Sequence, residues 1–234
     1  MAGQGPTGIS RREFVKYSGA AGVTTVLAGC TSGGDAEGTT TGETDSGPDE
    51  VVIGSNHPLS GSLANTGERM DEAVQLAALI KNEAGGIESL GGAELRVISG
   101  DNEGAQELGG EVAQELIDDG ADVLTGCYSS PVTSAASRVA ESNQVPFVIS
   151  VSVADSILQE TPLDYVYRPQ PPANQMAVDH ARLLADTIRG ADRTIDTAGL
   201  FYIDISFGQS IRDALRRELP ANDIEIIEET AISF

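Results

Sequence analysis

From residue 51 onward, short apolar runs alternate with longer segments in which apolar residues recur every three or four positions. The short runs are rich in β-branched residues and predict strands, whereas the longer spacing predicts amphipathic helices. Strands are expected at residues 51–53, 95–98, 123–124, 146–149, 165–167, 200–203 and 224–227. Helices are expected at residues 70–84, 108–119, 131–140, 176–189 and 207–219. This alternation indicates an α/β protein whose parallel sheets carry helices on both faces.

A proline-rich stretch at residues 168–172 interrupts the alternation once. Prolines at this density stiffen a crossing segment and remove donors from any sheet. We therefore expect two lobes, a first α/β lobe over residues 51–168 and a second over residues 169–234.

The segment that follows the third predicted strand carries the most informative polar residues. Ser129 and Ser130 precede Pro131, a residue favoured in the first turn of a helix, and serine is a common N-cap. We expect Ser130 to cap this helix. The unpaired N–H groups of the first turn and the two serine hydroxyls would then form a neutral site for a small anion such as a carboxylate. Capping alone is the alternative role for Ser130.

The ends of the other predicted strands in the first lobe are polar as well. They carry Ser55-Asn56-His57, Asp101-Asn102 and Ser150-Val151-Ser152. In open parallel sheets the ligand crevice lies beyond the carboxyl ends of the strands. The succession of polar ends favours a binding role for Ser130 over capping alone.

The N-terminal region has the pattern of an export signal. Arg11 and Arg12 precede a modestly apolar stretch over residues 17–27, which is too short to span a bilayer, since that takes about 20 apolar residues. The paired arginines indicate a signal of the twin-arginine type. The following Leu-Ala-Gly-Cys30 resembles the lipobox of prokaryotic lipoproteins. We therefore expect a signal peptide over residues 1–29, with Cys30 lipidated and anchored to the outer face of the cell membrane.

Residues 31–50 contain glycine, threonine, serine and acidic residues without a large apolar side chain. Such a segment cannot offset its ordering entropy, so we expect a disordered tether over residues 30–50. The whole chain has 36 acidic residues against 14 lysines and arginines, a net charge of −22. This excess argues against nucleic acid as a partner, because phosphate binding needs clustered basic residues. Scarce lysine and spread acidity resemble proteins adapted to high salt, a halophilic character.

Six short motifs occur in order along the predicted lobes. They are Gly54-Ser-Asn-His-Pro-Leu-Ser-Gly61, Asn82-Glu-Ala-Gly-Gly-Ile87, Gly126-Cys-Tyr-Ser-Ser130, Val145-Pro-Phe-Val-Ile-Ser150, Tyr167-Arg-Pro169 and Phe207-Gly-Gln-Ser210. In this order, and after a lipobox, they resemble the branched-chain amino acid binding proteins of ABC importers. The resemblance covers residues 51–234 and implies the type I periplasmic-binding-protein fold, in which two lobes close around a ligand by hinge motion.

The resemblance also implies the positions of ligand-binding residues. Ser130, with Ser129 beside it, falls on the serine that binds the ligand carboxylate. Ser152 falls on a small residue whose backbone carbonyl receives the ligand ammonium. Thr66 falls on an aromatic lid position, and Phe207 on a tyrosine contact of the second lobe.

One position departs from the family pattern. Ala154 falls where amino-acid binders carry a threonine that clamps both ligand groups. Loss of that hydroxyl would weaken binding by roughly 1–3 kcal/mol if the ligand group that it binds is left unpaired. The ligand is therefore expected to be a branched-chain amino acid or a related amide.

Relatives of this kind run well past residue 234. We expect the second lobe to be incomplete, apolar surface to be exposed, and ligand binding by this chain alone to be weak. Whether the chain is a fragment or one part of a split gene product stays open, as does its oligomeric state.

The function expected from these features is that of an extracytoplasmic receptor that delivers its ligand to an ABC permease in the membrane. No enzymatic activity, catalytic residue, cofactor or metal ligand is expected, because His57 and His180 lack metal-ligand spacing and Cys127 is expected to be a small buried thiol. A ligand-sensing ectodomain of the same fold and a secreted α/β enzyme are the alternatives.

Overall fold

The computed structural model describes residues 47–159, 162–191 and 193–233. In chain order the elements are β1 (Glu50–His57), η1 (Gly61–Leu63), α2 (Ala64–Glu83), η2 (Glu88–Leu90), β2 (Glu94–Asp101), α3 (Gln106–Asp118), β3 (Val123–Gly126), α4 (Ser130–Asn143), β4 (Phe147–Ile149), α5 (Ser156–Gln159), β5 (Val166–Tyr167), α6 (Ala173–Gly190), β6 (Thr197–Ile203), α7 (Ser206–Ala221) and β7 (Glu225–Ile232). The expected export signal, Cys30 and the expected tether up to residue 46 lie outside the described residues. Within the described ranges, no helix combines the length and the apolar character that a membrane crossing requires.

The strands form two parallel sheets, ordered β2-β1-β3-β4-β5 and β6-β7. In the first sheet Gly54 of β1 pairs with Ile98 of β2 on one side and with Leu124 of β3 on the other. Parallel neighbours need a crossover connection, and the predicted helices supply it. The parallel α/β class predicted from the sequence is confirmed, and the break between the sheets falls between β5 and α6.

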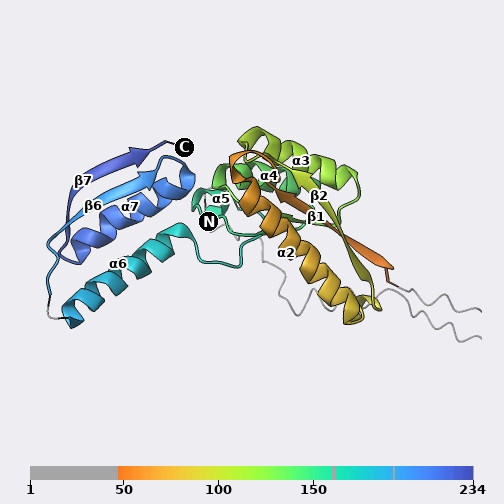
Figure 1. Cartoon of the computed structure of the whole chain (residues 1–234), viewed down its shortest axis with the longest axis horizontal. Helices are drawn as coiled ribbons and strands as arrows, with labels where there is room; N and C mark the ends of the chain where they lie inside the picture. The colour runs from red at the N-terminus through yellow and green to blue at the C-terminus, as the bar shows by residue number, and fades with distance from the viewer. Residues whose placement is uncertain (1–46, 160–161, 192, 234) are drawn as a thin grey trace, which may run out of the picture. The chain divides into compact units, whose positions relative to one another are not determined.

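Helices α2 and α3 cover opposite faces of the first sheet (Figure 1). The Asp71 carboxylate of α2 accepts a hydrogen bond of 2.8 Å from the Ser99 hydroxyl. The Asn56 side chain donates one of 3.0 Å to the Gly109 carbonyl of α3. Ser99 pairs with Ser55 in the sheet, and the residue after Ser55 is Asn56. Because successive strand residues point to opposite faces, the two helices lie on opposite sides.

The main core lies between the first sheet and the α3–α4 pair, which pack against each other. Leu124, Phe147 and Ile149 are fully buried there, among small side chains of the two helices. A Cβ atom on Gly109 of α3 would lie 2.6 Å from Cγ1 of Val132 on α4. The close approach of these helices therefore depends on glycine at that position.

The face of the sheet beside α2 is only partly covered by the described residues. A groove of about 560 Å³ runs there between α2 and the sheet, with Met70, Val74, Val123 and Val148 in its wall. The expected helices on both faces are confirmed, and the described residues leave part of the α2 face open. The expected exposure of apolar surface is confirmed.

Helix α2 begins at Ala64, six residues before the predicted start at Met70. The difference arises at Gly67, which looks like a turn residue in the sequence. A Cβ atom at this position would lie 1.9 Å from the Pro58 carbonyl oxygen. Gly67 thus lets the loop after β1 pack directly on the first turns of the helix, a tertiary contact that a local pattern cannot show.

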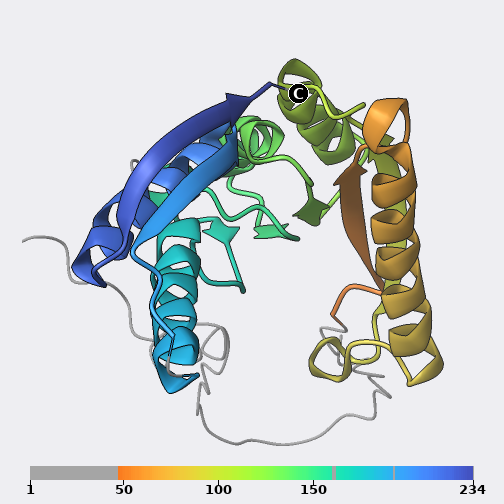
Figure 2. The ribbon, with the colours of Figure 1, turned by 60° about the vertical axis from the view of Figure 1, so that its left-hand side comes forward.

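The second sheet has a smaller core. Helix α7 packs against β6 and β7, and α6 packs against α7 (Figure 2). Leu200, Leu219 and Ile224 are buried together with Ala181 of α6. The predicted strand at residues 224–227 is longer in the structure, where β7 continues to Ile232 and pairs with the full length of β6.

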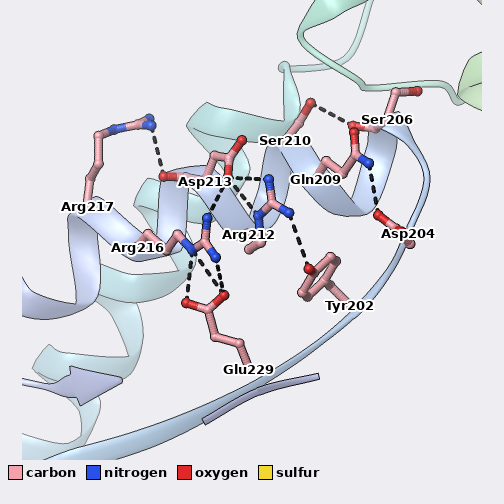
Figure 3. Close-up of polar contacts among 10 residues, drawn as sticks. All are labelled: Tyr202, Asp204, Ser206, Gln209, Ser210, Arg212, Asp213, Arg216, Arg217 and Glu229. Atoms are coloured by element: carbon pink, nitrogen blue, oxygen red, sulfur yellow. Dashed lines mark hydrogen bonds and ion pairs between the residues drawn. The ribbon is translucent and has the colours of Figure 1, made fainter. Parts of the chain in front are cut away.

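Charged side chains add to the contact between α7 and the second sheet (Figure 3). The Arg212 guanidinium lies 5.0 Å from the centroid of the Tyr202 ring. Arg216 donates from Nε to Oε1 of Glu229 over 2.9 Å, and this hydrogen bond lowers the pKa of Glu229. A lowered carboxylate pKa means that the pair stabilises the fold above the ordinary glutamate pKa and loses that effect as the pH falls through the lowered value.

Candidate functional site

A cavity of about 580 Å³ lies at the carboxyl ends of the strands. Its lining comes from the loops that follow β1, β2, β3 and β4, and from the end of β6 and the start of α7. The lining residues are Ser62, Leu63, Glu103, Gly104, Gln106, Tyr128, Ser129, Ser130, Pro131, Val132, Val151, Ser152, Val153, Ile203, Ile205 and Phe207. This position agrees with the expectation that a ligand crevice lies beyond the strand ends.

The N-terminus of α4 forms one part of the cavity wall, in a different register from the predicted one. The helix begins at Ser130, so Ser129 is the N-cap residue, and its side chain makes no capping hydrogen bond. The prediction that Ser130 caps the helix is therefore wrong. The helix starts one residue earlier because the Thr133 N–H donates to the Ser129 carbonyl over 2.9 Å, which places Ser130 inside the first turn.

Unused hydrogen-bonding groups gather at this helix terminus. Ser130 is 3% exposed and lines the cavity. Across the part of the chain that the structure describes, neither its hydroxyl nor that of Ser129 bonds to another residue. The N–H groups of Ser130 and Val132 belong to the first helical turn and so have no acceptor within the helix. This part of the wall is therefore neutral and rich in donors, as an anion site requires.

The serines of the β4 loop are occupied instead. Ser150 donates from its hydroxyl to the Cys127 carbonyl over 2.9 Å. Ser152 donates to the Tyr128 carbonyl over 3.0 Å, and its hydroxyl also contacts that of Thr133. These bonds hold the loop after β4 against the loop after β3. Ser152 lines the cavity, but its hydroxyl is already engaged within the protein.

Two predicted site residues do not line the cavity. Ala154 is fully buried in the main core, and its carbonyl accepts a hydrogen bond of 2.9 Å from Arg168. Thr66 lies half-buried in α2, and Ser62 and Leu63 of η1 line the cavity in its place. The structure thus brings Ser129, Ser130, Ser152 and Phe207 together, without Thr66 and Ala154.

The sequence reasoning missed the loop between β2 and α3 as part of the wall. This loop contributes Glu103, Gly104 and Gln106. The available signal was the polar strand end at Asp101, whose Oδ1 accepts N–H bonds from Leu59 (2.8 Å) and Glu103 (2.8 Å). The missed apolar residues Ile203 and Ile205 could be placed only once the end of β6 was located.

Cys127 precedes the cavity residue Tyr128 in the chain but does not itself line the cavity. Cys127 is fully buried just behind the wall, and burial raises the pKa of its thiol to about 12, so it stays protonated near neutral pH. This confirms the interpretation of Cys127 as a small buried thiol. Histidine and cysteine are missing from the lining residues. The described ranges contain no group of three or more His, Cys, Asp or Glu side chains arranged to hold a metal ion.

Comparison with known sequences identifies related proteins. A family model described as periplasmic binding protein matches residues 50–234. Leu/Ile/Val-binding protein homolog 8 of Brucella abortus is 33% identical over 165 residues, which are 69% of this chain and 40% of that protein. Homolog 7 of Brucella suis is 28% identical over 169 residues, with the same shares. The chain thus spans less than half the length of these relatives.

Solved structures show the same fold. A solute-binding protein of an ABC transporter from Rhodopseudomonas palustris, in complex with 3,4-dihydroxybenzoic acid, has a TM-score of 0.68 at 24% identity, over 80% of this chain and 48% of that one. A second structure is the branched-chain amino acid transporter substrate-binding protein LivJ of Streptococcus pneumoniae, in complex with isoleucine. It has a TM-score of 0.67 at 21% identity, over 79% of this chain and 50% of that one. At these identities the similarity concerns the fold.

Proposed function

We propose, from the premise that this chain belongs to the periplasmic binding protein family, that it is the ligand-binding part of a receptor outside the cytoplasm. The receptor delivers a branched-chain amino acid, or a related amide, to an ABC permease in the membrane. The names of the curated relatives support this ligand class. The observation that carries the proposal is the set of unused donors at the start of α4, which opens into a largely apolar cavity.

The two kinds of wall suit the two ends of such a ligand. The hydroxyls of Ser129 and Ser130 and the first-turn N–H groups of α4 would bind the carboxylate without a formal positive charge. The apolar wall, which includes Val153, Ile205 and Phe207, would cover the branched hydrocarbon. Burial of each methylene group contributes about 0.8 kcal/mol. A binding protein needs no catalytic group. The described lining residues include no pair of serine and histidine.

Replacement of Ser130 by alanine is expected to weaken leucine binding about tenfold, because a hydrogen bond to a charged group is lost. Ligand-observed NMR titration of the purified chain measures this, since the method reports weak affinities. Ser142→Ala is the matched control, because Ser142 lies on the same helix and, among the described residues, its hydroxyl bonds only to the Arg138 carbonyl, at 2.7 Å. Equal affinities in the wild type and Ser130→Ala would contradict the proposal.

We also propose that the protein is exported by the twin-arginine route and anchored through a lipid on Cys30. The support is the order of features in the sequence, in which Arg11 and Arg12 precede an apolar stretch that ends at Leu-Ala-Gly-Cys30. A lipid on Cys30 would hold the receptor at the outer face of the membrane, next to its permease.

The double change Arg11→Lys and Arg12→Lys is expected to stop export, although it keeps both positive charges. Fractionation of a prokaryotic host that has the twin-arginine machinery measures where the protein accumulates. The double variant Arg69→Lys and Arg182→Lys, at two exposed positions in the folded region, serves as the control and should be exported normally. Membrane association should be lost in Cys30→Ser, and normal export of the signal variant would refute the assignment.

A further inference from the structure

His57 is a buried titratable side chain that the proposed binding site does not use. It is the last residue of β1 and is fully buried. Its Nδ1 lies 3.0 Å from the Ser55 hydroxyl, whereas its Nε2 is buried without a hydrogen-bond partner among the described residues. In a neutral imidazole one ring nitrogen carries a proton and the other does not. The neutral ring therefore has one buried polar atom without a partner.

Uptake of a proton would make this environment much less favourable. In the imidazolium both nitrogens are donors, so the Nε2–H group would be buried without an acceptor in the described parts of the chain. The ring would also carry a positive charge away from water, which is unfavourable unless the charge is paired. Burial has the largest effect on the pKa of His57 and lowers it below its ordinary value. The neutral ring is therefore the form that the fold accommodates near pH 7.

The charged groups on the elements beside His57 compensate little for this burial. Asp71 of α2 raises the pKa of His57, but burial outweighs its effect. The Asp71 carboxylate is bonded to the Ser99 hydroxyl and to the Gln75 amide, at 2.8 and 2.6 Å. Asp101 of β2 pairs with His57 in the sheet, and its carboxylate accepts N–H groups from the loops after β1 and β2. Strands β3 and β4 contain no titratable residue.

The position of His57 connects the α2 face of the sheet with the ligand cavity. The next residue, Pro58, is fully buried, and its carbonyl packs on Gly67, where a Cβ atom would lie 1.9 Å away. The loop that begins at Pro58 leads to η1, which lines the cavity. The His57 carbonyl also accepts the N–H of Asn102 over 3.1 Å, in the second loop of the cavity wall. Displacement of His57 should therefore move two parts of that wall.

We propose that His57 is a pH-sensitive switch: when its ring takes up a proton, the end of β1 rearranges and the loop over residues 58–63 leaves its place in the cavity wall. Histidine is the side chain whose charge ordinarily changes between about pH 5 and 8, and the chain has two, His57 and His180. Because the pKa of His57 is lowered in the folded state, the stability that the neutral ring contributes is present above the ordinary histidine pKa. It is lost as the pH falls through the lowered value.

The switch has a consequence for the ligand, which rests on the proposed function because η1 belongs to the same cavity. Ligand binds the state in which the wall is complete, so binding should weaken as His57 takes up a proton. By linkage, a bound ligand should make that proton harder to bind.

The first test is an NMR titration of the wild-type chain from about pH 7.5 to about pH 5. It follows both histidine rings and the backbone amides of Ser62 and Leu63. The His57 ring should titrate below the ordinary histidine pKa, and the two amides should shift with the same midpoint. A ring that titrates while both amides stay unchanged would overturn the switch. So would a ring that stays neutral throughout while the chain remains folded.

Urea unfolding at a series of pH values is the second test. In His57→Asn an amide that does not titrate takes the place of the ring beside Ser55. Relative to this variant, the folding equilibrium constant of the wild type should fall by up to about tenfold for each pH unit below the ordinary histidine pKa. His180→Asn is the matched control, because His180 is an exposed residue of α6, and it should follow the wild type. Parallel profiles of the wild type and His57→Asn would overturn the proposal. The NMR titration needs no variant, so it decides the question even where His57→Asn does not fold.

Leucine binding, measured by ligand-observed NMR, extends the test to the cavity. The wild type should bind leucine about tenfold more weakly at about pH 5.5 than at about pH 7.5, whereas His57→Asn should bind it equally at both. Equal affinities of the wild type at both pH values would overturn the link between His57 and the cavity. Wild type that binds no leucine at either pH would overturn the proposed function, while the titration and the unfolding profiles would still decide the switch.

Discussion

Replacing Gly126 with alanine is expected to lower the free energy of unfolding by about 3 kcal/mol or more. Gly126 ends β3 with a φ of 139°, and a Cβ atom there would lie 2.2 Å from the Asn56 carbonyl oxygen. The substitution therefore combines a strained backbone with a clash against the neighbouring strand. Because Ser129 and Ser130 follow within four residues, the same change should also displace the donors of the cavity. Urea unfolding followed by circular dichroism measures the loss.

Gly120→Ala separates the two causes. Gly120 has a φ of 93°, and among the described residues beyond its two chain neighbours no atom would lie within 4 Å of an added Cβ. This variant has the backbone strain without the close contact, so its free energy of unfolding should fall by about 1 kcal/mol. If both variants lost the same amount of stability, the close contact between Gly126 and Asn56 would not be the cause.

The second large effect is expected in the core. Phe147→Ala should destabilise the protein by about 3–5 kcal/mol, the usual cost of a phenylalanine cavity. Phe147 is fully buried between the first sheet and the α3–α4 pair. Its strand is paired with β3 on one side and with β5 on the other, so the neighbouring backbone has little freedom to collapse into the space. Thermal or urea unfolding measures the change.

Val148→Ala is the matched control for this prediction. Val148 is the next residue on the same strand, but it is 39% exposed and lies in the groove on the opposite face. Truncation of Val148 should lower the free energy of unfolding by less than about 1 kcal/mol, as at exposed positions in general. A loss as large as that of Phe147→Ala would show that the α2 face is buried in solution.

The sequence by itself determined all the strands and the long helices of the folded region, but not the short helices η1, η2 and α5. This was possible because hydrophobic periodicity is a local property, and alternating strands and helices leave a parallel sheet as the main arrangement. The polar strand ends, such as Asp101 and Ser130, likewise marked the side of the sheet on which the cavity lies. The additional turns of α2 were missed, because Gly67 looks like a turn residue in the sequence and its close packing on Pro58 is a tertiary contact.

Tertiary structure alone decided which polar groups are free. Ser130 and Ser152 look equivalent in the sequence, but the Ser152 hydroxyl bonds to the β3 loop while that of Ser130 has no partner among the described residues. Ala154 belongs to the core, and Glu103 stands in the cavity wall. The physical reason is that hydrogen-bond partners and burial depend on residues distant in the chain. A sequence pattern identifies a residue as polar, whereas its availability to a ligand is set by its neighbours in space.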